Sequence, residues 1–351
     1  MIVVCTYFLV LALIVVLLVQ TSIGADLASN QFHIVLGAFL LLWRTPVEIN
    51  ALAGFIVLFG ISVLCIFAAA RLKGGFNNSL HQMFSNSERR RLPNWLLVMP
   101  LISSALALTV VAITILQGLF GVPTGSIQEP CDPANLVTGC IPPFSYLYQL
   151  SYAPPLEEVW FRISILGLLV ALRTLWSSNV LRNPFVQATP SPIGRGKLAL
   201  LSFLVPEYAK SRAGLPTFAK AGWKSIHWTE WIFLIMTSVA FGIAHYVANV
   251  GWEAGKVLTA GMAGFTLGLV FLLYGAYASI LLHWFFDVYF ATFLLSSILL
   301  GDALTPVADF VALLVLATGV IGVFAGIRWF RSTLRGSHGT TYIVPSVPSP
   351  V

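Results

Sequence analysis

Charged side chains are scarce in this sequence. Only 9% of the 351 residues are Asp, Glu, Lys or Arg, and 58% are apolar, whereas an average soluble domain carries roughly a quarter charged residues. A soluble fold cannot hide that much apolar surface from water, so we expect lipid to surround most of the chain. This composition excludes an ordinary soluble domain and predicts an integral, multi-pass membrane protein of the all-α class.

Cysteine motifs are missing as well. The four cysteines match no CxxC or zinc-ribbon spacing, and Cys5 and Cys65 lie within apolar runs, which argues against a metal–thiolate centre. Cys131 and Cys140 belong to the segment 123–143, which has no Lys or Arg. We predict a disulfide between them, because such a segment faces the side of the membrane where disulfides persist; two free thiols are the alternative.

Long apolar runs are plentiful. A transmembrane helix needs about 20 apolar residues, and eight runs of about this length or more lie near 2–20, 48–70, 95–121, 147–178, 229–249, 257–275, 278–300 and 307–327. We therefore predict a polytopic bundle of about eight transmembrane helices. The first run could alternatively be a signal peptide, since small residues follow it at 23–26. A shorter stretch, Ile34 to Trp43, is expected to be a re-entrant or interfacial piece.

Basic residues gather in three places. They lie between 71 and 94, between 182 and 227, and in the tail after 327, and an excess of Lys and Arg marks cytoplasmic loops. Two spans separate the first two places and four more separate the second from the tail, so the parity places both termini in the cytoplasm of a cell-membrane protein. The net charge of +6 thus reports topology, and we expect a lipid bilayer, not nucleic acid, as partner.

We divide the chain into three parts: N-terminal transmembrane helices over 1–143, a catalytic core over 144–300, and a last transmembrane helix with a cytoplasmic tail over 301–351. The core holds most ionisable residues found inside spans. A charge at bilayer depth costs on the order of 3 kcal/mol, so such residues carry a functional hypothesis by default. They are Glu157, Glu158 and Arg162 in one span, His245 in the next, and His283 with Asp287 in the span 278–300. Arg173 lies near a cytoplasmic helix end, where we expect it to snorkel.

The spacing of these residues is helical. Residues four apart share a helix face, so Glu158 lies next to Arg162, His283 next to Asp287, and Phe241 next to His245. If Glu158 and Arg162 neutralise each other, Glu157 remains as a carboxylate able to exchange a proton. This chemistry fits hydrolysis: Glu157, assisted by His245, would deprotonate a water while the other helix stabilises the oxyanion.

Three motifs then resemble a known family. The chain has Glu157-Glu158-x-x-x-Arg162, Phe241-x-x-x-His245 and His283-x-x-x-Asp287, in this order and within apolar segments. This is similar to the EExxxR, FxxxH and HxxxN or HxxxD motifs of the CAAX protease and bacteriocin-processing (CPBP, Abi-like) family, which includes the type II CAAX prenyl proteases. The resemblance covers roughly 145–300.

The resemblance implies an intramembrane endopeptidase. Glu157 would be the base, Glu158 and Arg162 its electrostatic partners, and His245, His283 and Asp287 would complete the site, with no cofactor. The substrate would be a peptide or a membrane-anchored, prenylated protein processed in the CAAX manner. One departure is Asp287 where Asn is usual: an ionised aspartate cannot donate to an oxyanion, so Asp287 is protonated, or orients His283, or binds a metal.

Other functions remain open from the sequence alone. A zinc-dependent peptidase would use His245, His283 and Glu157 as ligands. A proton-coupled transporter would also place carboxylates and histidines at the midplane, although no paired half-repeats are evident. A non-catalytic scaffold would keep the fold only, and the glutamates would then serve as a buried ion pair.

Overall fold

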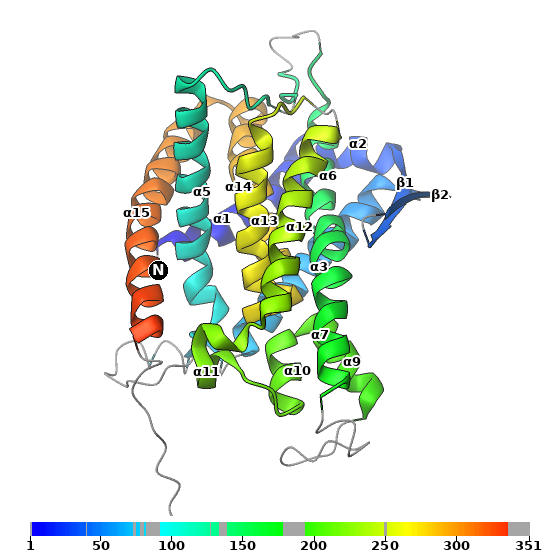
Figure 1. Ribbon diagram of the computed structural model, residues 1–351. Helices are drawn as coiled ribbons and strands as arrows, with labels where there is room; N and C mark the ends of the chain where they lie inside the picture. Colours follow the sequence, from blue (N-terminus) through cyan, green and yellow to red (C-terminus); the bar gives the residue numbers. More distant parts are fainter. Residues whose placement is uncertain are drawn as a thin grey trace, which may run out of the picture.

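A computed structural model describes residues 2–39, 41–72, 75–77, 81, 92–126, 128–132, 139–177, 194–248 and 251–335. The fold is an all-α bundle with one small two-stranded sheet at its side (Figure 1). Lys73, the run Arg89 to Arg91, Arg182 and the end of the tail, on which part of the topology prediction rests, lie outside the described residues.

Six of the described helices are long and apolar enough to cross a membrane, and a bent pair makes up to seven. The pair consists of α1 (Ile2–Gln20) and α2 (Ile23–Ser29), which meet at 69°. The six are α3 (Ala51–Arg71), α5 (Trp95–Leu119), α12 (Trp228–Val247), α13 (Lys256–Leu273), α14 (Ala276–Leu300) and α15 (Thr305–Arg335), the last preceded by the short turn η3 (Asp302–Leu304).

The remaining predicted span, 147–178, is divided into pieces too short to count on their own. It consists of α6 (Pro143–Glu157), the π-helix η1 (Glu158–Ile163) and α7 (Ile165–Leu175), which follow one another down the bundle (Figure 1). Pro154 and Pro155 lie inside α6 and remove two successive backbone donors. The ladder therefore breaks before η1, where Ser164 N–H reaches back five residues to Val159 C=O at 3.0 Å.

Helix α14 forms the core of the bundle. In its most apolar stretch 72% of the residues are buried, compared with 22% in α5 and in α15, and it packs against α1, α3, α6 and α13. Helices α5 and α15 pair at the outer edge (Figure 1). Helices α12 and α13 approach so closely that a Cβ on Gly242 would lie 2.2 Å from Val257 O, so only glycine fits there.

The short apolar stretch at 34–43 is part of a β-hairpin. Strands β1 (Gln31–Ala38) and β2 (Leu41–Asn50) pair antiparallel and project from the side of the bundle (Figure 1). The Tyr152 hydroxyl accepts from Val35 N–H at 3.2 Å and donates to Val35 C=O at 2.7 Å, and Ser164 Oγ accepts from Phe39 N–H at 3.1 Å. The hairpin is thus bound to α6 and to the residue that joins η1 to α7.

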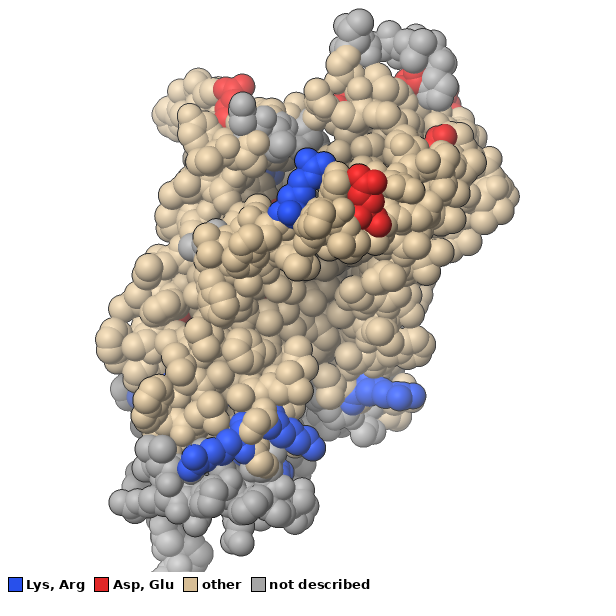
Figure 2. Space-filling view, turned by 90° about the vertical axis from the view of Figure 1, so that its right-hand side faces the viewer, with Lys and Arg blue, Asp and Glu red and all other residues tan. Residues whose placement is uncertain are grey.

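The two ends of the bundle differ in charge and chemistry. Short helices α9 (Arg195–Leu204), α10 (Pro206–Arg212) and α11 (Phe218–Ala221), with the turn η2 (Gly222–Ser225), close one end, where basic side chains gather below a largely uncharged belt (Figure 2). Cys131 and Cys140 form the predicted disulfide in the loop at the opposite end (Figure 1).

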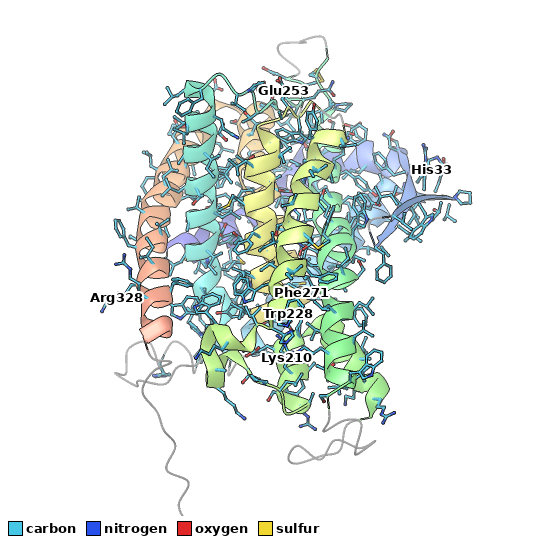
Figure 3. All side chains as sticks on the ribbon, viewed as in Figure 1. His33, Lys210, Trp228, Glu253, Phe271 and Arg328 are labelled. Carbon is cyan, nitrogen blue, oxygen red and sulfur yellow. A yellow bond between two sulfur atoms is a disulfide. The ribbon has the colours of Figure 1, made fainter. Side chains whose placement is uncertain are left out.

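A buried ion cluster holds the basic end together. Glu230 is fully buried, and its two oxygens lie 2.6 Å from Lys210 Nζ and 2.9 Å from Arg173 Nη1. Lys210 is itself only 1% exposed and lies below α12 and α13 (Figure 3). Arg173 therefore does more than the predicted snorkelling, because it neutralises a carboxylate of a neighbouring helix.

Candidate active site

The structure brings the motif residues of three separate chain segments to one place. Glu157 ends α6, Glu158 and Arg162 belong to η1, His245 lies near the end of α12, and His283 and Asp287 lie one turn apart on α14. Direct contacts join η1 to α14 and α12, so the predicted convergence of these segments is observed.

Glu158 is fully engaged by its neighbours. Its Oε1 lies 3.1 Å from Arg162 Nη1 and 2.9 Å from His283 Nδ1, and its Oε2 accepts a hydrogen bond from Ser279. Glu158 is fully buried and Arg162 is 1% exposed. The ion pair predicted from the i, i+4 spacing is present, and it leaves Glu158 with no oxygen free for water.

Glu157 lies in a different environment. Its side chain is 21% exposed, and its Oε2 lies 3.5 Å from His283 Nε2. The same Nε2 lies 3.8 Å from Asp287 Oδ2. His283 therefore has carboxylates on both ring nitrogens: Glu158 on Nδ1, and Glu157 with Asp287 on Nε2. These contacts favour an orienting role for Asp287.

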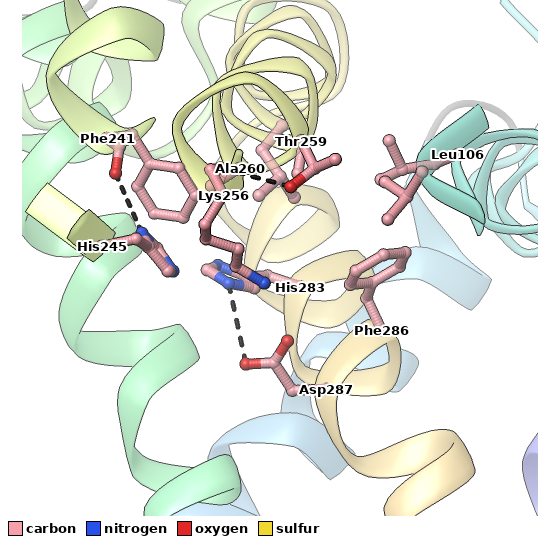
Figure 4. Close-up of a pocket in the computed structure, with 12 residues that line it drawn as sticks. Leu106, Phe241, His245, Lys256, Thr259, Ala260, His283, Phe286 and Asp287 are labelled. Atoms are coloured by element: carbon pink, nitrogen blue, oxygen red, sulfur yellow. Dashed lines mark hydrogen bonds and ion pairs between the residues drawn. The ribbon is translucent and has the colours of Figure 1, made fainter. Parts of the chain in front are cut away.

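His245 has a defined tautomer. Its Nδ1 lies 2.9 Å from Phe241 C=O, and a carbonyl oxygen only accepts, so Nδ1 carries the proton and a neutral ring keeps its lone pair on Nε2. That nitrogen points toward His283 across the pocket (Figure 4). A lone pair in this position accepts a hydrogen bond from a water or a substrate N–H.

Phe241 is the centre of the aromatic and cationic contacts. Arg162 Cζ lies 4.2 Å from its ring centroid, the His245 ring 4.6 Å and the His283 ring 5.7 Å. Within the described residues the Arg162 Nη atoms make no aligned hydrogen bond, so the ion pair with Glu158 and the Phe241 ring neutralise the cation. The phenylalanine of the second motif therefore supports the first and third motifs.

A pocket opens beside these residues. His245, His283 and Asp287 line it with Lys256, and apolar side chains of α5, α13 and α14 complete its wall (Figure 4). Its cavity volume is about 50 Å³, which exceeds the roughly 10–15 Å³ that one water requires. Glu157 is not one of the lining residues, but its Oε2 lies 3.5 Å from Nε2 of His283, which does line the pocket.

Two polar residues of the site were not predicted from the sequence. Ser279 lies one turn before His283 on α14, so the i, i+4, i+8 spacing of Ser279, His283 and Asp287 was a signal for it. Lys256 lies just before the predicted span 257–275, and no sequence signal pointed it into the pocket.

A zinc site was the alternative chemistry. Across the described residues, no group of three or more His, Cys, Asp or Glu side chains is placed to hold a metal ion. In the predicted set, His283 Nδ1 faces Glu158 and His245 Nδ1 faces a carbonyl. These two contacts do not themselves oppose a metal, because zinc-bound histidines commonly donate the other ring N–H to a carboxylate or a carbonyl. Since no third ligand is placed beside them among the described residues, we derive no step through a metal.

A comparison with protein families gives one match. Residues 140–289 match the family model described as type II CAAX prenyl endopeptidase, Rce1-like, and this range contains every motif residue named above. The family resemblance predicted from the three motifs is confirmed over this part of the chain. No curated protein and no solved structure matches the chain.

Proposed function

We propose that this chain, which carries an Rce1-like type II CAAX prenyl endopeptidase domain at residues 140–289, hydrolyses peptide bonds within the membrane with Glu157 as general base. The observation that carries the proposal is the contrast between the two adjacent glutamates. Both oxygens of the buried Glu158 have partners, in Arg162, His283 and Ser279, whereas Glu157 is 21% exposed and, within the described residues, forms its one ion-pair contact with the outer nitrogen of His283.

The proposed reaction needs a water beside Glu157 and the carbonyl carbon of the scissile peptide bond next to that water. Glu157 takes one proton from the water, the water oxygen bonds to the carbonyl carbon, and the π pair moves to the carbonyl oxygen. When that pair returns, the carbon–nitrogen bond breaks and its electrons go to nitrogen. The nitrogen takes the proton held by Glu157, so the products are a carboxyl group and an amine.

The histidines have separate tasks in this scheme. His245 Nε2 accepts a hydrogen bond and so positions the water or the leaving N–H. His283, held by Glu158 and Asp287, fixes the Glu157 carboxylate at 3.5 Å. Positioning of this kind is effective because little reorganisation remains when the reaction occurs.

The substrate we propose is a membrane-anchored, prenylated protein or peptide, cleaved in the CAAX manner. This proposal rests on the description of the matching family and on a site lined by apolar side chains among membrane-spanning helices. We place the protein in the cell membrane with its basic loops and both termini in the cytoplasm, on the strength of the Lys and Arg distribution.

The test is a cleavage assay on the protein purified in detergent. A fluorogenic farnesylated CAAX peptide and its unprenylated counterpart would be offered to the wild type, to Glu157→Gln, to His245→Ala and to the control Glu253→Gln, whose carboxylate is exposed at one end of the bundle (Figure 3). We expect a loss of about 10²–10⁴-fold in the first two variants and full activity in the control.

A chelator separates the mechanisms. Activity that a strong chelator leaves unchanged supports the glutamate mechanism, whereas loss with chelator and rescue by zinc would make the enzyme a metallopeptidase. Absence of cleavage of either peptide by the wild type would favour the scaffold or transporter function instead.

A further inference from the structure

Lys256 brings a cation into the pocket. It is the first residue of α13, it lines the pocket with His245, His283 and Asp287, and its side chain extends toward the His283 ring (Figure 4). The start of a helix carries partial positive charge and favours acidic side chains, so helix stability does not explain a lysine there.

The other polar groups around the pocket offer no free donor. His245 Nε2 carries a lone pair, and both nitrogens of His283 face carboxylates. Asp287 as a carboxylate only accepts, and the Thr259 hydroxyl donates to the Lys256 carbonyl at 3.2 Å. A peptidase needs donors where negative charge develops on the carbonyl oxygen. Of the side chains that line the pocket, Lys256 is the one whose donors are still available.

The ammonium group is held by an aromatic ring, and the carboxylates of Glu157 and Asp287 act on it only over a longer range than an ion pair. Lys256 Nζ lies 3.6 Å from the centroid of the Trp252 ring, a cation–π contact that fixes one side of the group. No carboxylate of the described residues lies within ion-pair distance of it. Its remaining N–H directions are therefore free to meet an anionic oxygen in the pocket.

We infer that Lys256 is a further catalytic residue, whose ammonium group stabilises the negative oxygen formed on the scissile carbonyl. This inference rests on the proposed function. When the carbonyl π pair moves to oxygen, the ammonium group of Lys256 donates a hydrogen bond to the oxyanion and attracts it electrostatically. Both interactions weaken when the pair returns to the carbonyl bond. No proton needs to leave the lysine in this step.

The experiment compares Lys256→Met with the charge-conserving Lys256→Arg in the purified full-length protein. We expect Lys256→Met to lower kcat by about 10²–10³-fold, as removal of an oxyanion donor does elsewhere, with KM little changed. Lys256→Arg should retain more activity than Lys256→Met. Equal thermal unfolding midpoints of all three proteins would show that the loss is not one of folding.

A second substitution separates catalysis from charge pairing. Asp287→Asn adds an amide donor to the pocket, so Lys256→Met should lower kcat at least tenfold less in that background than in the wild type. Because Asp287 also acts electrostatically on Lys256, a purely structural pair would show the same coupling in the thermal unfolding midpoints, whereas an oxyanion role couples kcat alone. Equal losses in both backgrounds, or unchanged kcat in Lys256→Met, would overturn the assignment.

The alternative anionic oxygen is the terminal carboxylate of the substrate. If Lys256 bound that group, Lys256→Met would raise KM for a peptide acid and not for the matching peptide amide, and this result would also overturn the assignment. The proposed function is judged separately, because it fails if Glu157→Gln cleaves like the wild type, if a chelator abolishes cleavage and zinc restores it, or if the wild type does not cleave at all.

Discussion

At the scale of single residues, burial separates the roles of two identical side chains. Glu157 and Glu158 are neighbours in the sequence, yet their side chains are 21% and 0% exposed. Glu158 exchanges its hydration for Arg162, His283 and Ser279, whereas Glu157 stays partly exposed beside His283. This contrast is why we propose a structural role for Glu158 and a catalytic role for Glu157.

This separation predicts opposite effects of two matched substitutions. Glu158→Gln leaves the buried Arg162 guanidinium without a counter-charge, and breaking such a pair costs about 3–5 kcal/mol. We expect a lower thermal unfolding midpoint in detergent for Glu158→Gln and a wild-type midpoint, without activity, for Glu157→Gln. Equal midpoints for the two variants would contradict this division of roles between the two glutamates.

Two buried serines on α14 give a second comparison. Ser279 donates to Glu158, whereas Ser296 Oγ is buried with no hydrogen-bond partner among the described residues. Loss of a buried partner costs about 1–3 kcal/mol, and removal of an unsatisfied hydroxyl costs little. Chemical denaturation should therefore show Ser279→Ala destabilised and Ser296→Ala close to wild type or more stable. The reverse order would mean that Ser279 does not hold Glu158.

The sequence predicted the site residues that belong to motifs and missed those that do not. Four-residue spacing located Glu158 with Arg162 and His283 with Asp287, because helix geometry fixes which side chains are neighbours. Lys256 was missed because its place depends on how α13 packs beside α14, a tertiary feature without local periodicity. The oxyanion role predicted for His283 and Asp287 also depended on contacts that spacing alone does not specify.

At the scale of secondary-structure elements, the hairpin depends on side chains of the bundle. Val35 of strand β1 contacts Tyr152, and Phe39, just after the strand, contacts Ser164, so an isolated two-stranded sheet gains support from the bundle. The sequence predicted that the segment 34–43 does not cross the membrane, but it did not predict the strands. A short apolar run has the same pattern in a helix and in a strand.

Tyr152→Phe tests this attachment. The change removes both hydrogen bonds to Val35 and leaves the ring, so we expect amide hydrogen exchange over 31–38 to rise by about 10- to 100-fold, the equivalent of 1–3 kcal/mol. Exchange in α14 should not change. Tyr208→Phe, at an exposed tyrosine of α10, is the control. Unchanged exchange in Tyr152→Phe would show that the hairpin is stable without the hydrogen bonds to Tyr152.

At the scale of the whole molecule, the layout of charge suggests an orientation. Basic side chains lie around the end closed by α9 to α11, and the disulfide lies at the other end. The orientation that we propose, from the positive-inside tendency, has the first of these ends in the cytoplasm and the disulfide on the oxidising side.

Labelling of single cysteines tests the orientation in intact cells. In a Cys5→Ser background, a membrane-impermeant maleimide should modify Gln128→Cys, an exposed position near the disulfide, and should reach Lys220→Cys only after the cells are opened. Labelling of Lys220→Cys in unbroken cells would mean the opposite orientation. Cys65 is buried and should stay unlabelled in both.

The sequence predicted the membrane bundle correctly in class and less well in detail. Hydropathy located each of the six long apolar helices and the first helix of the bent pair, because lipid requires continuous apolar runs. Hydropathy did not locate the break in 147–178, because it measures only how apolar a segment is. It carries no information on where two prolines and a wider turn interrupt the backbone hydrogen bonds of the helix.

The π-helix η1 has a consequence for insertions and deletions. An α-helix turns about 100° per residue, and the wider turn sets α6 and α7 out of phase with each other, so that α6 presents Glu157 to His283 while α7 buries Leu166 and Val170. Removal of one residue within 159–161 would bring both halves into a common phase. The helix could then keep either its packing in the bundle or the position of Glu157 beside His283, but not both. The length of this segment is therefore constrained, although its composition does not reveal the constraint.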